Sequence, residues 1–311
     1  MTTTIARPPA RSPRRSWVQH PTDGLAAALL ATARPRQWPK NVLVLAAPAA
    51  AGVLLRPGPA AAAAWAVVVF LLASVSTYFI NDARDAGADR RHPDKRRRPV
   101  AAGRLSVPAA YRIGAAVAAL AVVAALPLGP GLVAVIVLYL AMTLAYSLWL
   151  KDRPVVDLLV VASGFTLRAI AGGVATGVPL SNWFLLVAVF GSLFLVTAKR
   201  AAESRESPAR GPGRVVLAEY PAAWLQQVLT VALTGTVLSY ASWALQYVGQ
   251  DVAAPVLALS VLPFLAVMLR YSLLVARGEG EAPEDTLFAD RFLLTAGVVW
   301  LSVVVGALYL A

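Results

Sequence analysis

Three oxygen-bearing side chains recur every four residues in a polar segment that follows a long apolar stretch. They are Asn81, Asp85 and Asp89. Residues four apart lie close together on a helix, so one amide and two carboxylates are expected on one helix face. Hard oxygen ligands at this density suit Mg²⁺, which keeps several waters and shares phosphate oxygens. Asp82 points about 100° away from this face and is expected to lie behind the ligands.

Six cations follow this acidic stripe between Arg90 and Arg98, and Lys95 is one of them. Beside a bound Mg²⁺ they would form a basic wall suited to a diphosphate. A solvated helix end with mixed charges is the alternative, because acids and bases interleave here. Ionisable groups next to a long apolar helix are costly when idle, which favours the functional interpretation.

The elements that position these residues are apolar blocks. The chain has 311 residues, of which 59% are hydrophobic and 14% charged, whereas soluble domains average about 45–50% and about 25%. Blocks of about 17–25 apolar residues match helices that cross a ~30 Å hydrocarbon core. We therefore expect an all-α integral membrane protein with about nine transmembrane helices, at 40–55, 60–80, 107–127, 131–150, 155–174, 182–198, 223–247, 253–275 and 290–310. The first is short and contains Pro48, which is consistent with a tilted or re-entrant helix.

The cations predict the orientation in the membrane. Most of the Lys and Arg residues lie in or next to the loops on one side of the predicted membrane. The loops on the opposite side hold only Arg56, and Arg168 lies within a span. By the positive-inside rule, the N-terminus and the acidic stripe are cytoplasmic and the C-terminus is external. Residues 1–33 are expected to form a disordered basic cytoplasmic tail without a cleavable signal peptide, and residues 34–311 a single nine-helix domain.

Composition excludes some chemistry. There is no Cys, so thiolate catalysis, disulfides and Cys-ligated metals are excluded. The formal net charge of +12 suits anionic lipids or phosphorylated substrates. Nucleic acid is not an expected partner, because the cations are divided among loops that face a membrane. A homo-oligomer is left open.

Several strings resemble one family. The Asn-x-x-x-Asp-x-x-x-Asp segment and the basic loop that ends at Arg98-Pro99 resemble the first signature of the UbiA superfamily of intramembrane prenyltransferases. Other strings, 34–41, 92–95, 146–151, 163–173 and 199–203, resemble a branch that transfers a phosphoribosyl group to decaprenyl phosphate. The resemblance extends over nearly the whole chain, and implies nine helices around a cytoplasm-facing cavity in a bacterial plasma membrane.

The resemblance also implies an activity. The donor would be phosphoribosyl pyrophosphate, the acceptor a polyprenyl phosphate such as decaprenyl phosphate, and the cofactor Mg²⁺ held by Asn81, Asp85 and Asp89. The product would be a precursor for cell-wall arabinan. Further residues expected to bind substrate are Lys40, Asn41, Lys95, Arg98, Tyr146, Lys151, Asp157, Arg168, Lys199 and Arg200.

Single members of this set have plainer alternatives. Lys40, Lys199 and Arg200 could serve only the positive-inside bias, and Tyr146 could sit in the aromatic interface belt. Arg168 shares a helix face with Asp157. It could face the cavity as a partner for an anionic lipid head group, or be a structural Arg paired with a carboxylate. The glycines at 172–173 are expected to break or thin the end of this helix.

One departure from the family pattern separates two functions. Most of the superfamily carries a second Asp-x-x-x-Asp, whereas Asp152 and Asp157 here are five apart. This spacing does not predict a second diphosphate–metal site like the first, which argues against the alternative activity, prenyl transfer from a prenyl diphosphate to an aromatic acceptor. A transporter would show broken helices near the midplane and inverted repeats, and the sequence shows neither. A structural scaffold would not need the acidic stripe.

Overall fold

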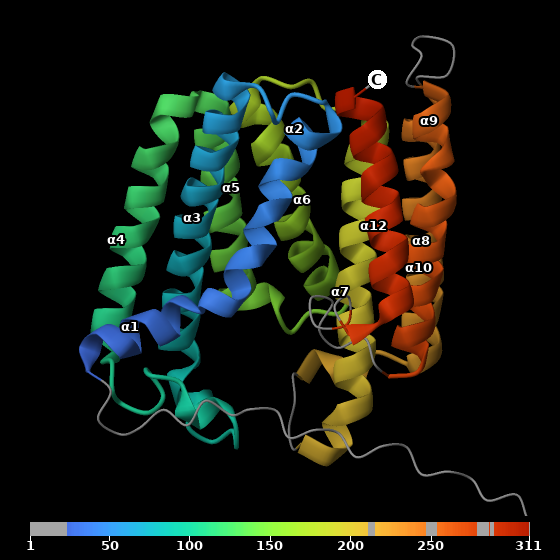
Figure 1. Ribbon diagram of the computed structural model, residues 1–311. Coiled ribbons are helices and arrows are strands. Elements are labelled where there is room, and N and C mark those ends of the chain that lie inside the picture. The colour runs from blue at the N-terminus through green and yellow to red at the C-terminus, as the bar shows by residue number, and fades with distance from the viewer. Residues whose placement is uncertain (1–23, 211–214, 247–253, 279–285, 287–288, 311) are drawn as a thin grey trace, which may run out of the picture.

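The computed structural model describes residues 24–210, 215–246, 254–278, 286 and 289–310. The regular elements in this part of the chain are all helices, without a β-strand. The elements are arranged as an upright bundle (Figure 1). In chain order they are α1 Leu25–Ala33, η1 Pro35–Leu45, α2 Ala46–Ala50, α3 Pro57–Asp89, η2 Lys95–Arg97, α4 Val107–Ala125, η3 Leu126–Leu128, α5 Pro130–Ala145, η4 Tyr146–Leu150, α6 Val156–Thr176, α7 Asn182–Arg210, η5 Val215–Glu219, α8 Ala222–Leu245, α9 Ala254–Leu259, α10 Val261–Ala276, α12 Arg291–Val305 and η6 Gly306–Leu310.

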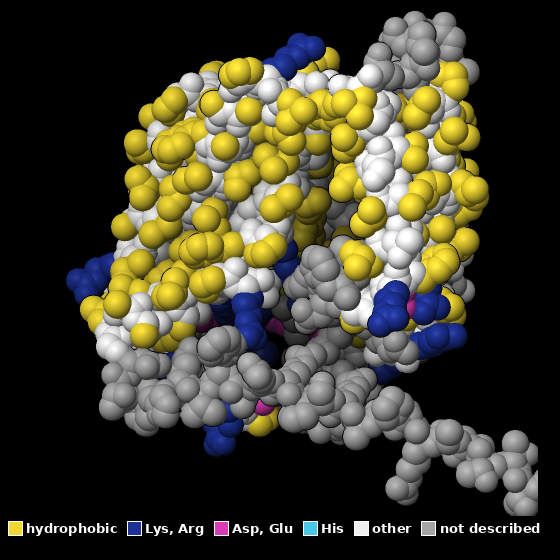
Figure 2. All heavy atoms as spheres, in the orientation of Figure 1, with side chains coloured by type: hydrophobic (Ala, Val, Ile, Leu, Met, Phe, Trp, Pro, Cys, Tyr) yellow, Lys and Arg dark blue, Asp and Glu magenta, His cyan; other side chains and the backbone are white. Residues whose placement is uncertain are grey.

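The predicted membrane fold is confirmed. Among the described residues, eight helices are long and apolar enough to span a bilayer. Hydrophobic side chains cover the outer face of the bundle over most of its height, and most Lys and Arg side chains gather toward its lower end (Figure 2). Such a surface is typical of a protein embedded in a lipid bilayer, with its positive charge concentrated at one membrane interface.

The first predicted span, 40–55, differs in kind from the other eight. The chain here forms the 3₁₀ helix η1 followed by the short helix α2, with Pro39 inside η1 and Pro48 inside α2. The eleven residues of η1 and the five of α2 together rise about 30 Å, because a 3₁₀ helix rises about 2.0 Å per residue. This segment climbs from the lower to the upper end of the bundle (Figure 1), so a stretched helix makes the ninth crossing.

The N-terminal end departs from the predicted tail. Residues 1–23 lie outside the described part of the chain, but Leu25–Ala33 form α1 instead of the expected disordered segment. Eight of these nine residues are Ala or Leu, the residues with the highest helix propensity. In Figure 1 this helix lies across the lower end of the bundle, next to the start of η1.

Helix starts follow from local sequence. Ser106 caps α4 by accepting a hydrogen bond from Ala109 N at 3.3 Å, and Pro108 occupies the first turn, where its missing N–H has no cost. Asp290 caps α12 by accepting from Leu293 N at 2.8 Å, and it pairs with Arg270 at 2.6 Å. Hydrogen bonding from Arg270 lowers the pKa of Asp290, so this cap remains charged near neutral pH.

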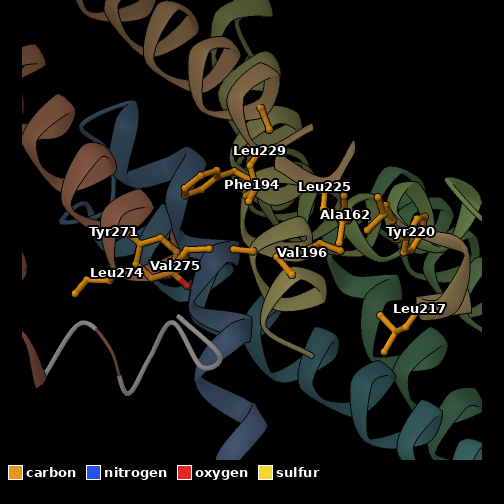
Figure 3. Close-up of a cluster of buried hydrophobic side chains, with 14 of the residues drawn as sticks. Ala162, Phe194, Val196, Leu217, Tyr220, Leu225, Leu229, Tyr271, Leu274 and Val275 are labelled. Atoms are coloured by element: carbon orange, nitrogen blue, oxygen red, sulfur yellow. The ribbon is translucent and has the colours of Figure 1, made fainter. Parts of the chain in front are cut away.

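Buried apolar clusters hold the helices of the bundle together. The largest joins α6, α7, η5, α8 and α10 through side chains that include Phe194, Leu225 and Tyr271 (Figure 3). The rings of Phe194 and Tyr271 meet edge to face, with centroids 5.8 Å apart, a favoured arrangement of aromatic pairs.

The glycines at 172–173 do not break α6, and this prediction is wrong. The helix continues to Thr176. A Cβ at Gly172 would lie 1.7 Å from Val44 O, so the glycine lets η1 pack directly against α6. Small residues serve this purpose at helix crossings in membranes.

Candidate active site

A cavity of about 460 Å³ lies between η1, α3, α5, η4, α6 and α7. Its wall carries five cations and, within the described part of the chain, no acidic side chain. The cations come from three elements and are Arg36, Lys40, Arg168, Lys199 and Arg200. Such a concentration of cations among membrane-spanning helices is typical of a functional site, and the cavity is suited to phosphate groups.

The stripe predicted on one helix face lies on the last turns of α3. Asn81 lines the cavity. Asp85 is about one-third exposed and pairs with Lys151 Nζ at 2.8 Å. Asp89 is nearly buried and accepts from Arg98 Nη1 at 2.7 Å. The three members therefore range from the cavity wall to the base of the bundle.

Asp82 lies behind the stripe, and it is buried. It pairs with Arg34 and accepts from Arg98 Nη1 at 3.3 Å. Arg98 thus bridges Asp82 and Asp89, and it fastens the loop 90–106 to the end of α3. These two carboxylates are neutralised by guanidinium groups, which leaves Asp85 as the most accessible acid of the segment.

The residues present fit a Mg²⁺ ion that shares ligands with a substrate. No group of three or more His, Asp or Glu side chains in the described residues could enclose a metal ion. Asn81 and Asp85 are four residues apart on α3, and Asn81 lies on the cavity wall while Asp85 is about one-third exposed. Mg²⁺ is commonly held by one or two carboxylates plus substrate phosphates, so a two-residue donor set is sufficient.

Arg168 is held within the bundle by neutral groups. Its Nε donates to Asn41 Oδ1 at 3.0 Å and its Nη1 to Gly164 O at 2.7 Å. Its Nη2 donates to Ser74 Oγ at 3.0 Å and to Tyr139 OH at 3.1 Å. Only 6% of its surface is exposed, and no carboxylate among the described residues pairs with it. The charge therefore stays uncompensated at the cavity wall.

Aromatic rings complete the surroundings of this guanidinium. Its carbon lies 5.0 Å from the centroid of Phe70, 5.1 Å from that of Tyr139 and 5.5 Å from that of Phe165. Cation–π contacts of this kind stabilise a desolvated cation. One alternative from the sequence was that Arg168 is a structural residue paired with a carboxylate. The structure shows neutral partners and aromatic rings instead, so this alternative is wrong.

Arg200 is fixed in the opposite manner, by a buried acid. Its Nε and Nη2 donate to the two oxygens of Asp157 at 2.7 and 2.9 Å, and Tyr146 OH donates to the same carboxylate at 2.6 Å. Asp157 is fully buried. Arg200 and Tyr146 line the cavity while Asp157 lies behind them, so the carboxylate orients the wall instead of facing the substrate.

A strained turn precedes Asp157. Val155 has φ +65°, and Val156 N donates to Pro154 O at 2.7 Å. This γ-turn geometry is costly for a β-branched residue. Tyr220 OH accepts from Val155 N at 3.0 Å and holds the turn, and burial raises the pKa of the Tyr220 phenol. The second acidic motif of the family pattern is replaced here by a turn that aims one carboxylate at Arg200.

Ser147 is a site residue that spacing did not identify. It lies in the π-helix η4, and its hydroxyl donates to Asn81 Oδ1. Arg84 donates to the backbone carbonyls of Ser147 and Leu148 at 2.9 and 3.1 Å. π-Helical turns are frequent at functional sites, but a pattern of single residues does not reveal them.

The predicted metal-binding and substrate-binding residues fall into three groups. Those on the cavity wall are Lys40, Asn81, Tyr146, Arg168, Lys199 and Arg200. Asn41 and Asp157 lie behind Arg168 and Arg200 respectively. Asp85, Asp89, Lys95, Arg98 and Lys151 do not line it and lie at or beyond the end of α3.

Residues 42–295 match the UbiA prenyltransferase family. The chain belongs to this family. Among UbiA-family relatives, it is 42% identical to the decaprenyl-phosphate phosphoribosyltransferase of Corynebacterium glutamicum over 298 residues, covering 94% of this chain and 90% of the relative. It is also 42% identical to the enzyme of that name from Mycobacterium tuberculosis over 295 residues, covering 93% and 97%.

A solved structure agrees with the UbiA fold. A UbiA homolog from Archaeoglobus fulgidus, bound to GPP and Mg²⁺, superposes with a TM-score of 0.67 and covers 90% of this chain and 99% of its own. The two sequences are 18% identical, so this likeness supports the helical arrangement of the family alone.

Proposed function

We propose that this protein transfers the 5-phosphoribosyl group of phosphoribosyl pyrophosphate to decaprenyl phosphate and releases pyrophosphate. The observation that carries the proposal is the cavity with five cations and no described acidic side chain on its wall. Both substrates and the product pyrophosphate are multiply charged anions. The relatives at 42% identity bear the name of this activity.

The transfer breaks the bond between ribose C1 and the pyrophosphate oxygen, and forms one between C1 and an oxygen of the lipid phosphate. Lys199 and Arg200, which lie on the cavity wall, are placed to stabilise the charge that develops on the departing pyrophosphate. The attacking phosphate is already anionic, so no side chain needs to remove a proton. This fits a wall without a His or an acid.

Asn81 and Asp85 would hold Mg²⁺, which when bound neutralises part of the negative charge of the pyrophosphate. Asp89 has a different part in this proposal, because its carboxylate is engaged by Arg98. It positions the basic loop at the mouth of the site. Lys95 and Arg98, which belong to this loop, would contact the donor as it enters.

Arg168 and Lys40 are assigned to the acceptor. Arg168 has an uncompensated charge deep among apolar helices, where a lipid phosphate can reach it. Lys40 lies on the same wall. The proposed location is the bacterial plasma membrane with the active site and N-terminus cytoplasmic, and the product would feed cell-wall arabinan synthesis.

Prenyl transfer to an aromatic acceptor is the competing activity within the family. It would use a second pair of acids for a prenyl diphosphate. Asp157 is fully buried and committed to Arg200, while Asp152 is exposed in the loop before it. These two carboxylates do not form a second metal site, which favours the phosphoribosyl donor.

A transfer assay tests the proposal. Purified protein in detergent is given radiolabelled phosphoribosyl pyrophosphate, decaprenyl phosphate and Mg²⁺, with an EDTA control. We expect label in the lipid phase only when Mg²⁺ is present. Transfer from a prenyl diphosphate to an aromatic acid, without transfer of the ribosyl label, would assign the competing activity instead.

A further inference from the structure

A second hollow lies on the other side of α3, between α3, α4 and α5. It has a volume of about 330 Å³. Its walls come from consecutive turns of the three helices and from the start of η4, and they include Ser76, Thr77, Asn81, Ala118, Thr143 and Ser147. We call this hollow the α3–α5 groove.

The groove is apolar in character although four hydroxyl groups lie along it. Ser76 donates to Gly114 O at 2.8 Å, Thr77 to Ser74 O at 2.7 Å, and Thr143 to Tyr139 O at 2.8 Å. Hydroxyls that are satisfied by backbone carbonyls present mainly carbon to a ligand. A hydrocarbon can therefore lie in the groove without leaving polar groups unpaired.

The groove adjoins the cationic cavity. Thr77, Asn81 and Thr143 belong to the walls of both. Val137, Ala141 and Leu144 are exposed on the outer face of α5, within a helix that spans the membrane. The groove thus runs from the lipid-facing surface to the Asn81 edge of the site, and it fits a ligand with a hydrocarbon chain and one anionic end.

We propose that the α3–α5 groove holds the isoprenoid chain of the acceptor beyond the first unit, which is the one attached to the phosphate. This rests on the proposed function and names the place and side of lipid entry. The polyprenyl phosphate is a single chain with a single charged end, whereas a phospholipid has two chains and a larger head group. A groove bordered by three helices accommodates the single chain, with the phosphate inside the cavity.

A filled groove tests this assignment. Ala118→Phe places a ring in the groove from α4, and Ala119→Phe is the matched control, because Ala119 is exposed and outside the groove. We expect Ala118→Phe to raise the KM for decaprenyl phosphate by about tenfold, the size of an overpacking penalty. The KM for phosphoribosyl pyrophosphate, and that for dimethylallyl phosphate, which has one isoprene unit, should stay within twofold or so of wild type.

A second variant, on another wall of the groove, distinguishes a filled groove from a folding defect. Ala141→Phe fills the groove from α5, and it should reproduce the selective loss with the long acceptor. An equal rise of KM for both acceptors, or none in either variant while wild-type protein transfers label, would overturn the groove assignment.

A binding measurement separates this proposal from the proposed function. A photoreactive decaprenyl phosphate should crosslink to peptides of α4 and α5, and unlabelled decaprenyl phosphate should compete for it where phosphatidylglycerol does not. Crosslinking without ribosyl transfer would reject the proposed function and leave the groove as a polyprenyl phosphate site. Equal competition by phosphatidylglycerol would make it a bulk-lipid groove and overturn the inference.

Discussion

Arg168 and Asn41 lie 127 positions apart in the chain, and Arg168 Nε donates a hydrogen bond of 3.0 Å to Asn41 Oδ1. The same oxygen accepts from Ser74 Oγ at 3.1 Å, and the Asn41 amide donates to Trp38 O at 3.2 Å. A neutral side chain from η1 thus orients a buried guanidinium on α6 without cancelling its charge.

Replacing this amide with a carboxylate tests whether the charge is used. Asn41→Asp keeps the shape and the hydrogen bond to Arg168 but neutralises the guanidinium. We expect the KM for the polyprenyl phosphate to rise about tenfold or more, because a hydrogen bond to a charged group contributes about 1.5–3 kcal/mol. The melting temperature in detergent should stay near that of wild type. An unchanged acceptor KM in a folded Asn41→Asp protein would leave Arg168 with a structural role only.

Asp85 offers a sharper test of the metal ligands. Asp85→Asn removes a charged oxygen ligand and should reduce transfer to background. The free energy of unfolding should change by about 1 kcal/mol or less, because the pair with Lys151 is partly exposed. Asp94→Asn is the matched control, since Asp94 is an exposed acid in the following loop. It should retain wild-type activity. Full transfer by Asp85→Asn would remove Asp85 from the site.

The packing of η1 on α6 predicts unequal costs for two helical glycines. Gly172→Ala would place a methyl group 1.7 Å from Val44 O, so η1 must move, and overpacking of this kind costs about 1–3 kcal/mol. Gly297→Ala in α12 meets nothing within 4 Å, and it should leave stability unchanged or raise it by up to about 1 kcal/mol. Thermal unfolding in detergent measures both. Equal effects would mean that η1 and α6 are not in close contact.

The spacing of Asn81, Asp85 and Asp89 was sufficient to place them on one helix, because helical period is a local property. Their partners were not predictable in the same way. Arg34 meets Asp82 across 48 positions, and this pairing depends on how the chain before η1 packs against α3. Spacing therefore identified the acids but could not show which of them are neutralised.

The first crossing shows the same limit for the fold. Pro48 predicted an irregular helix, but neither proline specifies that eleven residues adopt 3₁₀ geometry. That geometry satisfies the distance across the membrane and the contact at Gly172, both of which are set by the rest of the bundle. The sequence pattern of the segment 35–50 alone therefore cannot predict the 3₁₀ geometry.

The buried pair of Asp157 and Arg200 gives the last prediction. Asp157→Asn leaves Arg200 charged and only partly compensated, and breaking such a pair typically costs about 3–5 kcal/mol. Glu203→Gln is the control, because Glu203 pairs with the same guanidinium at 2.8 Å from a partly exposed position, where a pair contributes about 1 kcal/mol or less. Thermal unfolding in detergent should separate the two variants clearly.

A double variant then separates stability from activity. Asp157→Leu with Arg200→Met replaces the pair by apolar side chains, which is often neutral for stability. We expect it to unfold near the wild-type temperature and yet to lose transfer, because the guanidinium of Arg200 lines the cavity where pyrophosphate would depart. If the double variant is stable and transfers at the wild-type rate, Arg200 serves only to hold α6 against α7, and the leaving group must be stabilised by the other cations of the wall.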